Sequence, residues 1–118
     1  MREVGWEAKK KMEKLYKADI NISTSGDNII ISAPGAGHYL AIDFITLFPT
    51  TAVAVQFKTG STSYGGALPL DAKQAVTIEN SIKNQDGVIT CGDNEEFIIN
   101  LGGNVQVGGF LRYRIIGN

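Results

Sequence analysis

The sequence has few of the side chains on which enzymes and metal centres depend. It contains one cysteine, Cys91, and one histidine, His38, among 118 residues. A single cysteine cannot form a disulfide within the chain, and its immediate neighbours include no other metal ligand. We therefore expect Cys91 to be a small buried side chain. We expect His38, at the start of a predicted strand, to be a solvated or hydrogen-bonded structural residue.

The sequence also lacks long apolar runs and a large net charge. No apolar stretch approaches the roughly 18 residues that a membrane helix needs, and the N-terminus lacks the apolar segment and small-residue cleavage site of a signal peptide. The formal net charge is −1, which argues against a nucleic-acid binder. We expect no membrane association, and we disfavour nucleic acid as a partner.

The acidic residues form no recognisable catalytic or metal-binding motif. Asp93, Glu95 and Glu96 are close in sequence, but they lack the alternating oxygen ligands of a calcium loop, so we expect a solvated charged turn. Glycosidases need two carboxylates that face each other across a cleft. No phosphate-binding Gly-Lys-Ser/Thr is present. We expect no catalytic residue, no cofactor and no metal, and therefore no enzyme.

Asp43 is the one acid within a long apolar run. It could be buried, or it could point outward from a strand. It could also pair with Arg112 or Arg114 on the last predicted strand. We favour the pairing, because a charge in apolar surroundings is costly unless a partner offsets it.

The chain is organised around residues Thr51 to Leu70. Val53, Val55 and Phe57 alternate with less apolar residues, which predicts a half-buried strand. A run of turn-forming residues over 59–63 then reverses the chain, and the alternation resumes at Leu68. We predict two strands joined by a loop.

Similar patterns recur along the rest of the chain, punctuated by many of its 14 glycines. His38 to Phe48 is the longest predicted strand, and both its faces are largely apolar, so we expect it to be covered on both sides or to bend between two sheets. The other predicted strands cover 19–23, 29–33, 75–79, 88–91, 96–101 and 105–115. About eight short strands with turns every 8–12 residues favour an all-β sandwich or barrel, and eight antiparallel strands in two sheets make a jelly roll.

An N-terminal arm precedes these strands. Apolar side chains recur at helical spacing between Val4 and Ala18, and residues 1–18 contain six basic and three acidic residues. We predict an amphipathic, basic helix over Val4 to Ala18 that needs a partner surface, followed by a β-sandwich domain over 19–118. The expected attachment residues of this helix are Val4, Trp6, Ala8, Lys11, Met12, Leu15 and Tyr16.

The order of several short motifs resembles small β-sandwich virion proteins of tailed bacteriophages, of the head-decoration, head-fibre or tail-fibre type. The motifs are Asp27-Asn28-Ile29-Ile30, Pro34-Gly35-Ala36-Gly37, Tyr39-Leu40-Ala41-Ile42, Val53-x-Val55-x-Phe57-Lys58-x-Gly60-Ser61-Thr62, Gly66-x-Leu68-x-Leu70 and Val107-Gly108-Gly109-x-Leu111-x-Tyr113. The resemblance covers about Asp27 to Ile116. It implies a jelly-roll-like structural protein, often a trimer, located in the virion after assembly in the host cytoplasm. The basic arm departs from this pattern and suggests a tether to another virion protein, such as the major capsid protein.

A carbohydrate- or receptor-binding module is the alternative. Sugar sites on β-sandwiches need exposed aromatic side chains, and Tyr39 and Tyr64 are the expected glycan contacts. Both tyrosines are also compatible with ordinary packing, so the sequence alone leaves the alternative open.

Overall fold

The computed structural model describes residues 14–81 and 84–117, which form nine β-strands and no helix. The predicted all-β class is therefore confirmed. The strands are β1 (Tyr16–Ile22), β2 (Gly26–Ile31), β3 (His38–Pro49), β4 (Val53–Thr59), β5 (Thr62–Leu70), β6 (Val76–Glu79), β7 (Ile89–Thr90), β8 (Phe97–Leu101) and β9 (Val107–Gly117).

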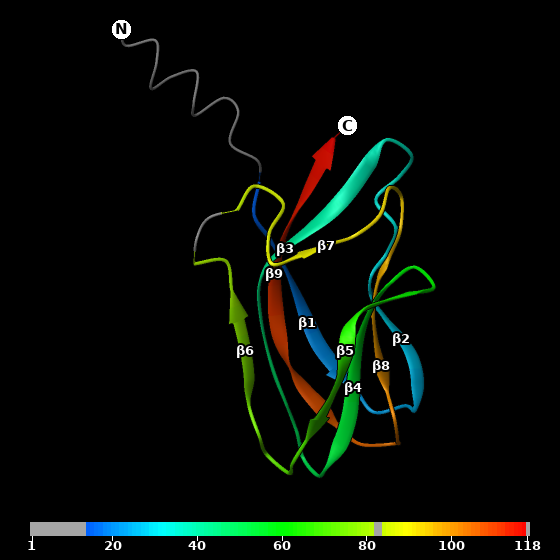
Figure 1. Ribbon diagram of the computed structural model, residues 1–118, viewed down its shortest axis with the longest axis vertical. Helices are drawn as coiled ribbons and strands as arrows, with labels where there is room; N and C mark the ends of the chain where they lie inside the picture. Colours follow the sequence, from blue (N-terminus) through cyan, green and yellow to red (C-terminus); the bar gives the residue numbers. More distant parts are fainter. Residues whose placement is uncertain (1–13, 82–83, 118) are drawn as a thin grey trace, which may run out of the picture.

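The strands form two antiparallel sheets (Figure 1). The five-stranded sheet has the order β1-β9-β3-β6, and β7 also pairs with β3. The four-stranded sheet has the order β2-β8-β4-β5. Neighbours in each sheet are mostly far apart in sequence, so the pairing is dominated by long-range contacts. The arrangement is sandwich-like, with one core between the sheets.

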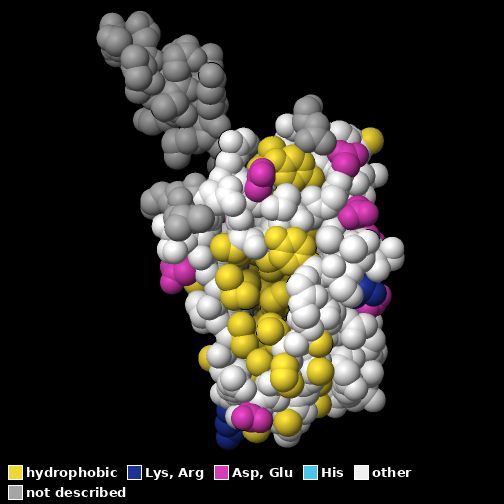
Figure 2. Space-filling model, viewed as in Figure 1, with side chains coloured by type: hydrophobic (Ala, Val, Ile, Leu, Met, Phe, Trp, Pro, Cys, Tyr) yellow, Lys and Arg dark blue, Asp and Glu magenta, His cyan; other side chains and the backbone are white. Residues whose placement is uncertain are grey.

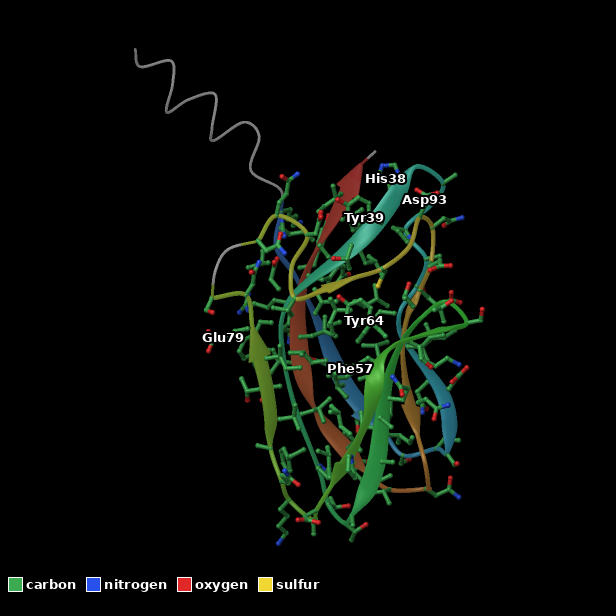
Figure 3. The ribbon with its side chains drawn as sticks, viewed as in Figure 1. His38, Tyr39, Phe57, Tyr64, Glu79 and Asp93 are labelled. Carbon is green, nitrogen blue, oxygen red and sulfur yellow. The ribbon has the colours of Figure 1, made fainter. Side chains whose placement is uncertain are left out.

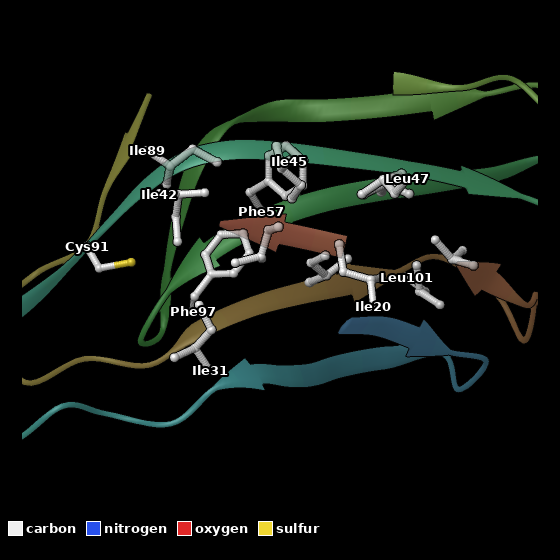
Figure 4. Packing of buried hydrophobic residues seen from close by; sticks show 14 of the residues in the cluster. Ile20, Ile31, Ile42, Ile45, Leu47, Phe57, Ile89, Cys91, Phe97 and Leu101 are labelled. Carbon is white, nitrogen blue, oxygen red and sulfur yellow. The ribbon is translucent and has the colours of Figure 1, made fainter. Parts of the chain in front are cut away.

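Alternating apolar residues from both sheets build this core (Figure 4). On β4, Val53, Val55 and Phe57 are buried while Ala54 is exposed, as the alternation predicted. Phe57 packs against Phe97 of β8, with ring centroids 5.9 Å apart. Burial of an apolar side chain of this size contributes roughly 1.5–3 kcal/mol, so the core is the main source of stability.

The long strand β3 changes the phase of its alternation in the middle. Leu40 and Ile42 are fully buried before the change, and Ile45 and Leu47 are buried after it. The pairing with β9 is irregular between Ile42 and Phe44, which marks a β-bulge at the intervening residue. An extra residue shifts the side-chain phase by one. The bulge explains why both faces of this strand look apolar in the sequence.

The predicted hairpin over Thr51 to Leu70 is confirmed as β4 and β5, with a tighter turn at 60–61 than expected. A second irregularity interrupts its ladder, because Val55 pairs with Leu68 while Phe57 pairs with Tyr64. Gly65 lies inside this bulge with φ +74°. The Gln56 side chain donates to the backbone carbonyls of Tyr64 and Gly65 and so fills the gap.

The expected helix over Val4 to Ala18 extends too far. Tyr16 to Ala18 belong to β1 and pair with β9, from Tyr16–Tyr113 to Ala18–Leu111. Cross-strand pairing and the stacking of Tyr16 on Tyr113, with centroids 5.3 Å apart, favour the strand there over helical spacing. Residues 1–13 lie outside the described residues. The strand predicted over 29–33 also begins too late and ends too late, because β2 runs from Gly26 to Ile31.

Candidate functional site

The connection from β6 to β7, described at residues 80–81 and 84–88, contacts both sheets and defines the candidate site. At one end, the Asn80 side chain donates to Asp43 of β3 at 3.1 Å and to the Asn84 carbonyl at 2.7 Å. At the other end, the Val88 amide donates to the Ile42 carbonyl at 2.7 Å. The β3 bulge therefore anchors the connection on both sides.

An ion pair in this bulge holds the connection on the outer face of the five-stranded sheet. Arg114 of β9 donates to Asp43 from Nε to Oδ2 at 2.6 Å and from Nη2 to Oδ1 at 3.0 Å. The same Nη2 donates to the Gln85 carbonyl at 2.6 Å. The Asp43 and Arg114 side chains are 18% and 16% exposed. The predicted pairing of Asp43 with an arginine of the last strand is confirmed, with Arg114 as the partner.

The two predicted glycan contacts both reach this connection (Figure 3). The Tyr39 hydroxyl donates to Asp86 Oδ1 at 2.7 Å, and the Tyr64 hydroxyl lies 3.5 Å from the Val88 carbonyl. Tyr39 comes from the five-stranded sheet and Tyr64 from the four-stranded sheet. Tyr64 is 37% exposed, whereas Tyr39 is half-buried. Two tyrosines 25 positions apart in sequence thus converge on two residues of one loop, Asp86 and Val88.

Two hollows border the connection. One, of about 430 Å³, is lined among others by Asp43, Phe44, Arg114 and the exposed Leu15. The other, of about 340 Å³, is lined by Glu79, Asn80, Ser81, Asn84, Gly87 and Val88. Amide and carboxylate side chains stand beside apolar surface in both linings, so these hollows suit ligands that offer hydroxyl groups together with an apolar face.

An apolar band lies between β6 and β5 (Figure 2), where the edges of the two sheets leave the core incompletely covered. Leu68 of β5, Val76 and Ile78 of β6, and Val88 pack against the core but remain partly accessible. The Tyr64 ring lies at one end of this band. The band and the second hollow therefore form one continuous surface with an apolar floor and a polar end.

The other predicted site candidates have structural roles in the described part of the chain. His38 is exposed, and its Nδ1 lies 3.2 Å from the Ala36 carbonyl, as expected. Cys91 is 4% exposed, which confirms its predicted burial, and that burial raises the pKa of its thiol to about 11. This thiol is therefore protonated and unreactive near neutral pH.

The acidic segment after Cys91 is less solvated than predicted. Thr59, buried at the end of β4, donates to Glu95 Oε1 at 2.7 Å and accepts from the Gly92 amide at 2.9 Å. The Glu95 carboxylate therefore fastens the tip of the β4–β5 hairpin to the loop before β8. The expectation of a solvated turn was wrong for Glu95, because its spacing gives no indication of the distant Thr59.

Most of the predicted attachment residues, from Val4 to Met12, lie outside the described residues. Leu15 is 48% exposed beside the larger hollow. Tyr16 is half-buried in β1, and the Lys14 ammonium lies 5.1 Å from its ring centroid. The arm therefore joins the five-stranded sheet next to the Asp43–Arg114 pair.

Sequence reasoning missed the residues of the β6–β7 connection that make the site. Asn80, Gln85 and Asp86 look like ordinary turn residues in the sequence, and Val88 begins a predicted strand. Gln85 and Val88 contact Arg114 and Tyr64 through their main-chain carbonyls. Such contacts cannot be predicted from the identity of the side chain. The Asp-Gly pair at 86–87 indicates the turn, but nothing there indicates its contacts with two tyrosines.

No protein-family model matches this chain, and no curated protein matches it at a significant level. Among residues 14–81 and 84–117, no group of three or more His, Cys, Asp or Glu is arranged to hold a metal ion. Within the same ranges, no helix could cross a membrane.

Proposed function

We propose that the two sheets form a jelly roll. The strand order β1-β9-β3-β6 opposite β2-β8-β4-β5 supports this topology. Successive strands β1 and β2, β3 and β4, and β5 and β6 alternate between the two sheets, as expected for two nested Greek keys. Viral capsid proteins and lectins are two groups that use jelly rolls.

We further propose that the protein is a structural component of a tailed-phage virion, of the capsid-decoration or head-fibre type. The observation that carries this is the N-terminal junction, where a predicted basic arm joins the body. In that body Asp43 pairs with Arg114, Thr59 bonds Glu95 and Lys58 pairs with Asp27, so these charged side chains have structural roles. Residues 1–15 would form the tether, which the apolar spacing predicts to be helical. The major capsid protein is the expected partner, and the particle the expected location.

Truncation of the arm tests this proposal. Removal of residues 1–14 leaves every β1 pair intact, whereas removal through Ala18 would also break the ladder with β9. We expect the full chain to co-sediment with particles of the phage that encodes it, and the truncated chain to stay in the supernatant with an unchanged melting temperature. Equal co-sedimentation of the truncated chain would refute the tether. Absence of the chain from purified particles, measured by mass spectrometry, would refute the virion assignment.

A glycan- or receptor-binding module is the second candidate. The convergence of Tyr39 and Tyr64 on the β6–β7 connection favours it, because an exposed ring beside amide and carboxylate groups suits the apolar and hydroxyl faces of a sugar. The exposed Tyr64 would stack on the sugar ring. The hydroxyl of the half-buried Tyr39 would position the loop through Asp86.

A glycan array with the purified chain tests the second candidate, with Tyr64→Ala as the principal variant. Tyr64→Phe is the matched control, because it keeps the ring and removes only the long hydroxyl contact to Val88. Binding that is lost in Tyr64→Ala and retained in Tyr64→Phe would support stacking. Absence of any glycan signal at high protein concentration would refute the candidate.

A further inference from the structure

The outer face of the five-stranded sheet has an ordered pattern of charges and aromatic rings. Residues that pair across neighbouring strands point to the same face. The register therefore puts Lys17, Arg112, Phe44 and Glu79 in one row across β1, β9, β3 and β6. Lys17, Arg112 and Glu79 are exposed, which identifies this as the outer face. The row is positive at the β1 side and negative at the β6 side.

Two further rows lie below it. The second contains Asp19, Phe110, Thr46 and Thr77, and the third contains Asn21, Gly108 and Phe48. Phe44 and Phe110 contact each other, with centroids 5.5 Å apart. Phe48 is 48% exposed and lies beside Gly108, where a β-carbon would meet no atom within 4 Å. The centre of this face is therefore aromatic, with an open space next to the most exposed ring.

The side chains of Arg112 and Glu79 make no hydrogen bond or ion pair with other described residues, although each carries a full charge. Lys17 pairs only with its neighbour Asp19, at 3.0 Å, and both are largely exposed. Glu79 is three strands away from Lys17 in the same sheet, a separation of about 15 Å. Within one molecule these opposite charges cannot meet.

We propose that this face binds a second copy of the same chain, through a two-fold axis that runs roughly parallel to the strands between the two copies. Such an axis places β6 over the partner's β1 and β3 over the partner's β9. Glu79 then faces the partner's Lys17, Arg112 lies over the ring of the partner's Phe44, and Phe48 enters the space at the partner's Gly108. Each contact occurs twice, as an isologous interface requires. The arginine-ring contact adds a cation–π attraction.

The size of the face sets the expected strength. Four strands about 4.8 Å apart and three rows about 6.8 Å apart cover roughly 400 Å² per copy. Counted over both copies this is about 800 Å², below the roughly 1,200–2,000 Å² that stable interfaces bury, so the dimer is a weak one that forms at high local concentration and dissociates on dilution. Attachment of many copies to one particle would supply that concentration, but the contact itself does not depend on the proposed function.

Charge reversal provides a sharp test. Sedimentation equilibrium over a range of concentrations should show a monomer–dimer equilibrium for the full chain. Glu79→Lys and Lys17→Glu should each weaken dimerisation by roughly tenfold or more, because each places like charges together twice. The double variant should recover association. Because the two residues are too far apart to meet within one chain, recovery requires contact between copies. Asp71→Lys, an exposed loop position, is the control and should leave dimerisation unchanged.

Several results would overturn the proposal. These are a monomer at every concentration, no recovery in the double variant, or a trimer as the associated species, which is the state that the family resemblance implies and which a two-fold contact cannot produce. Phe48→Asp gives an independent check, because the ring is 48% exposed and lies outside the core cluster. It should abolish dimerisation while the melting temperature, measured at concentrations where the chain is monomeric, changes little.

Discussion

Removal of the Asp43 carboxylate should destabilise the fold considerably more than removal of a surface carboxylate. Asp43→Ala leaves the Arg114 guanidinium without its bidentate partner and the Asn80 amide without one acceptor. Exposed ion pairs contribute about 0–1 kcal/mol, and breaking fully buried pairs costs about 3–5 kcal/mol. The two side chains here are 18% and 16% exposed. We therefore expect a loss between these limits, about 2 kcal/mol.

The assay is thermal or urea unfolding followed by circular dichroism. For a chain of this size, a loss of 2 kcal/mol lowers the melting temperature by roughly 8 °C. Asp19→Ala is the matched control, because Asp19 pairs with Lys17 in a bridge whose side chains are 74% and 55% exposed. This control should cost under about 0.5 kcal/mol.

A double-mutant cycle separates the pair from the rest of the site. Asp43→Ala, Arg114→Ala and the double variant should give a coupling energy of about 1 kcal/mol or more. If Asp43→Ala were no more destabilising than Asp19→Ala, or if the coupling were near zero, the ion pair would not anchor the β6–β7 connection. The bulge would then be held by backbone contacts alone.

Three further predictions concern other parts of the fold. Gly109→Ala should lower the free energy of unfolding by over about 3 kcal/mol. The φ of Gly109 is +157°, and a β-carbon there would overlap the Thr46 carbonyl and lie 2.7 Å from Leu47 Cα. Comparable unfolding midpoints for Gly109→Ala and for Gly66→Ala, at an open exposed position, would contradict this. Cys91 should react with a thiol reagent at pH 8 only after unfolding, because burial raises its pKa to about 11; rapid labelling of the native chain would show an accessible thiol. Hydrogen bonds from Asn100 and Lys58 lower the pKa of Asp27 in the folded chain. The ionised carboxylate should therefore contribute its full stabilisation above pH 5, well above the ordinary aspartate pKa of about 4. This stabilisation should disappear as the pH falls through the lowered pKa of the folded state. The difference in melting temperature between the original chain and Asp27→Asn should shrink to zero over that acidic range. A difference that stays constant with pH would refute the dependence of stability on Asp27 ionisation.

Simple alternation was sufficient to predict the strands, because the core imposes a period of two on every strand that has one buried face. β4 is the clearest case, with Val53, Val55 and Phe57 buried as predicted. The prediction of which side chains are buried was ambiguous where the alternation of buried and exposed residues changes phase. In β3 the bulge at Asp43 shifts the buried side from Leu40 and Ile42 to Ile45 and Leu47, and periodicity alone could not distinguish such a shift from two apolar faces.

The site was harder to predict than the fold, because it depends on contacts between residues far apart in sequence. Charge compatibility was enough to predict an arginine partner for Asp43. The convergence of Tyr39 and Tyr64 on one loop depends on strand order, which local patterns do not fix. The end of the predicted arm was wrong for a related reason, since Tyr16 to Ala18 have helix-compatible spacing but are paired with a strand that begins some 90 residues later.

The outer faces of the two sheets differ in how their charges are paired, and this difference can be tested against the proposed dimer. On the four-stranded sheet, Lys58 pairs with Asp27 at 2.9 Å, and Asn100 donates to the same carboxylate at 2.7 Å. Ile98, the cross-strand partner of Lys58 and Ile29, is 6% exposed. Ile29 is the one large exposed apolar side chain among the described residues of that face. The charges of this face therefore satisfy one another.

The five-stranded sheet shows the reverse. Its outer face keeps Arg112 and Glu79 without partners among the described residues and leaves the Phe48 ring half exposed. These charges, unpaired among the described residues, have opposite signs and lie on either side of an aromatic centre. They cost little in water, and they are complementary to the same face of a second copy related by a two-fold axis. Reversal of Lys58 should therefore change stability without changing association, and reversal of Glu79 should change association without changing stability. The opposite pattern would assign the binding face to the other sheet.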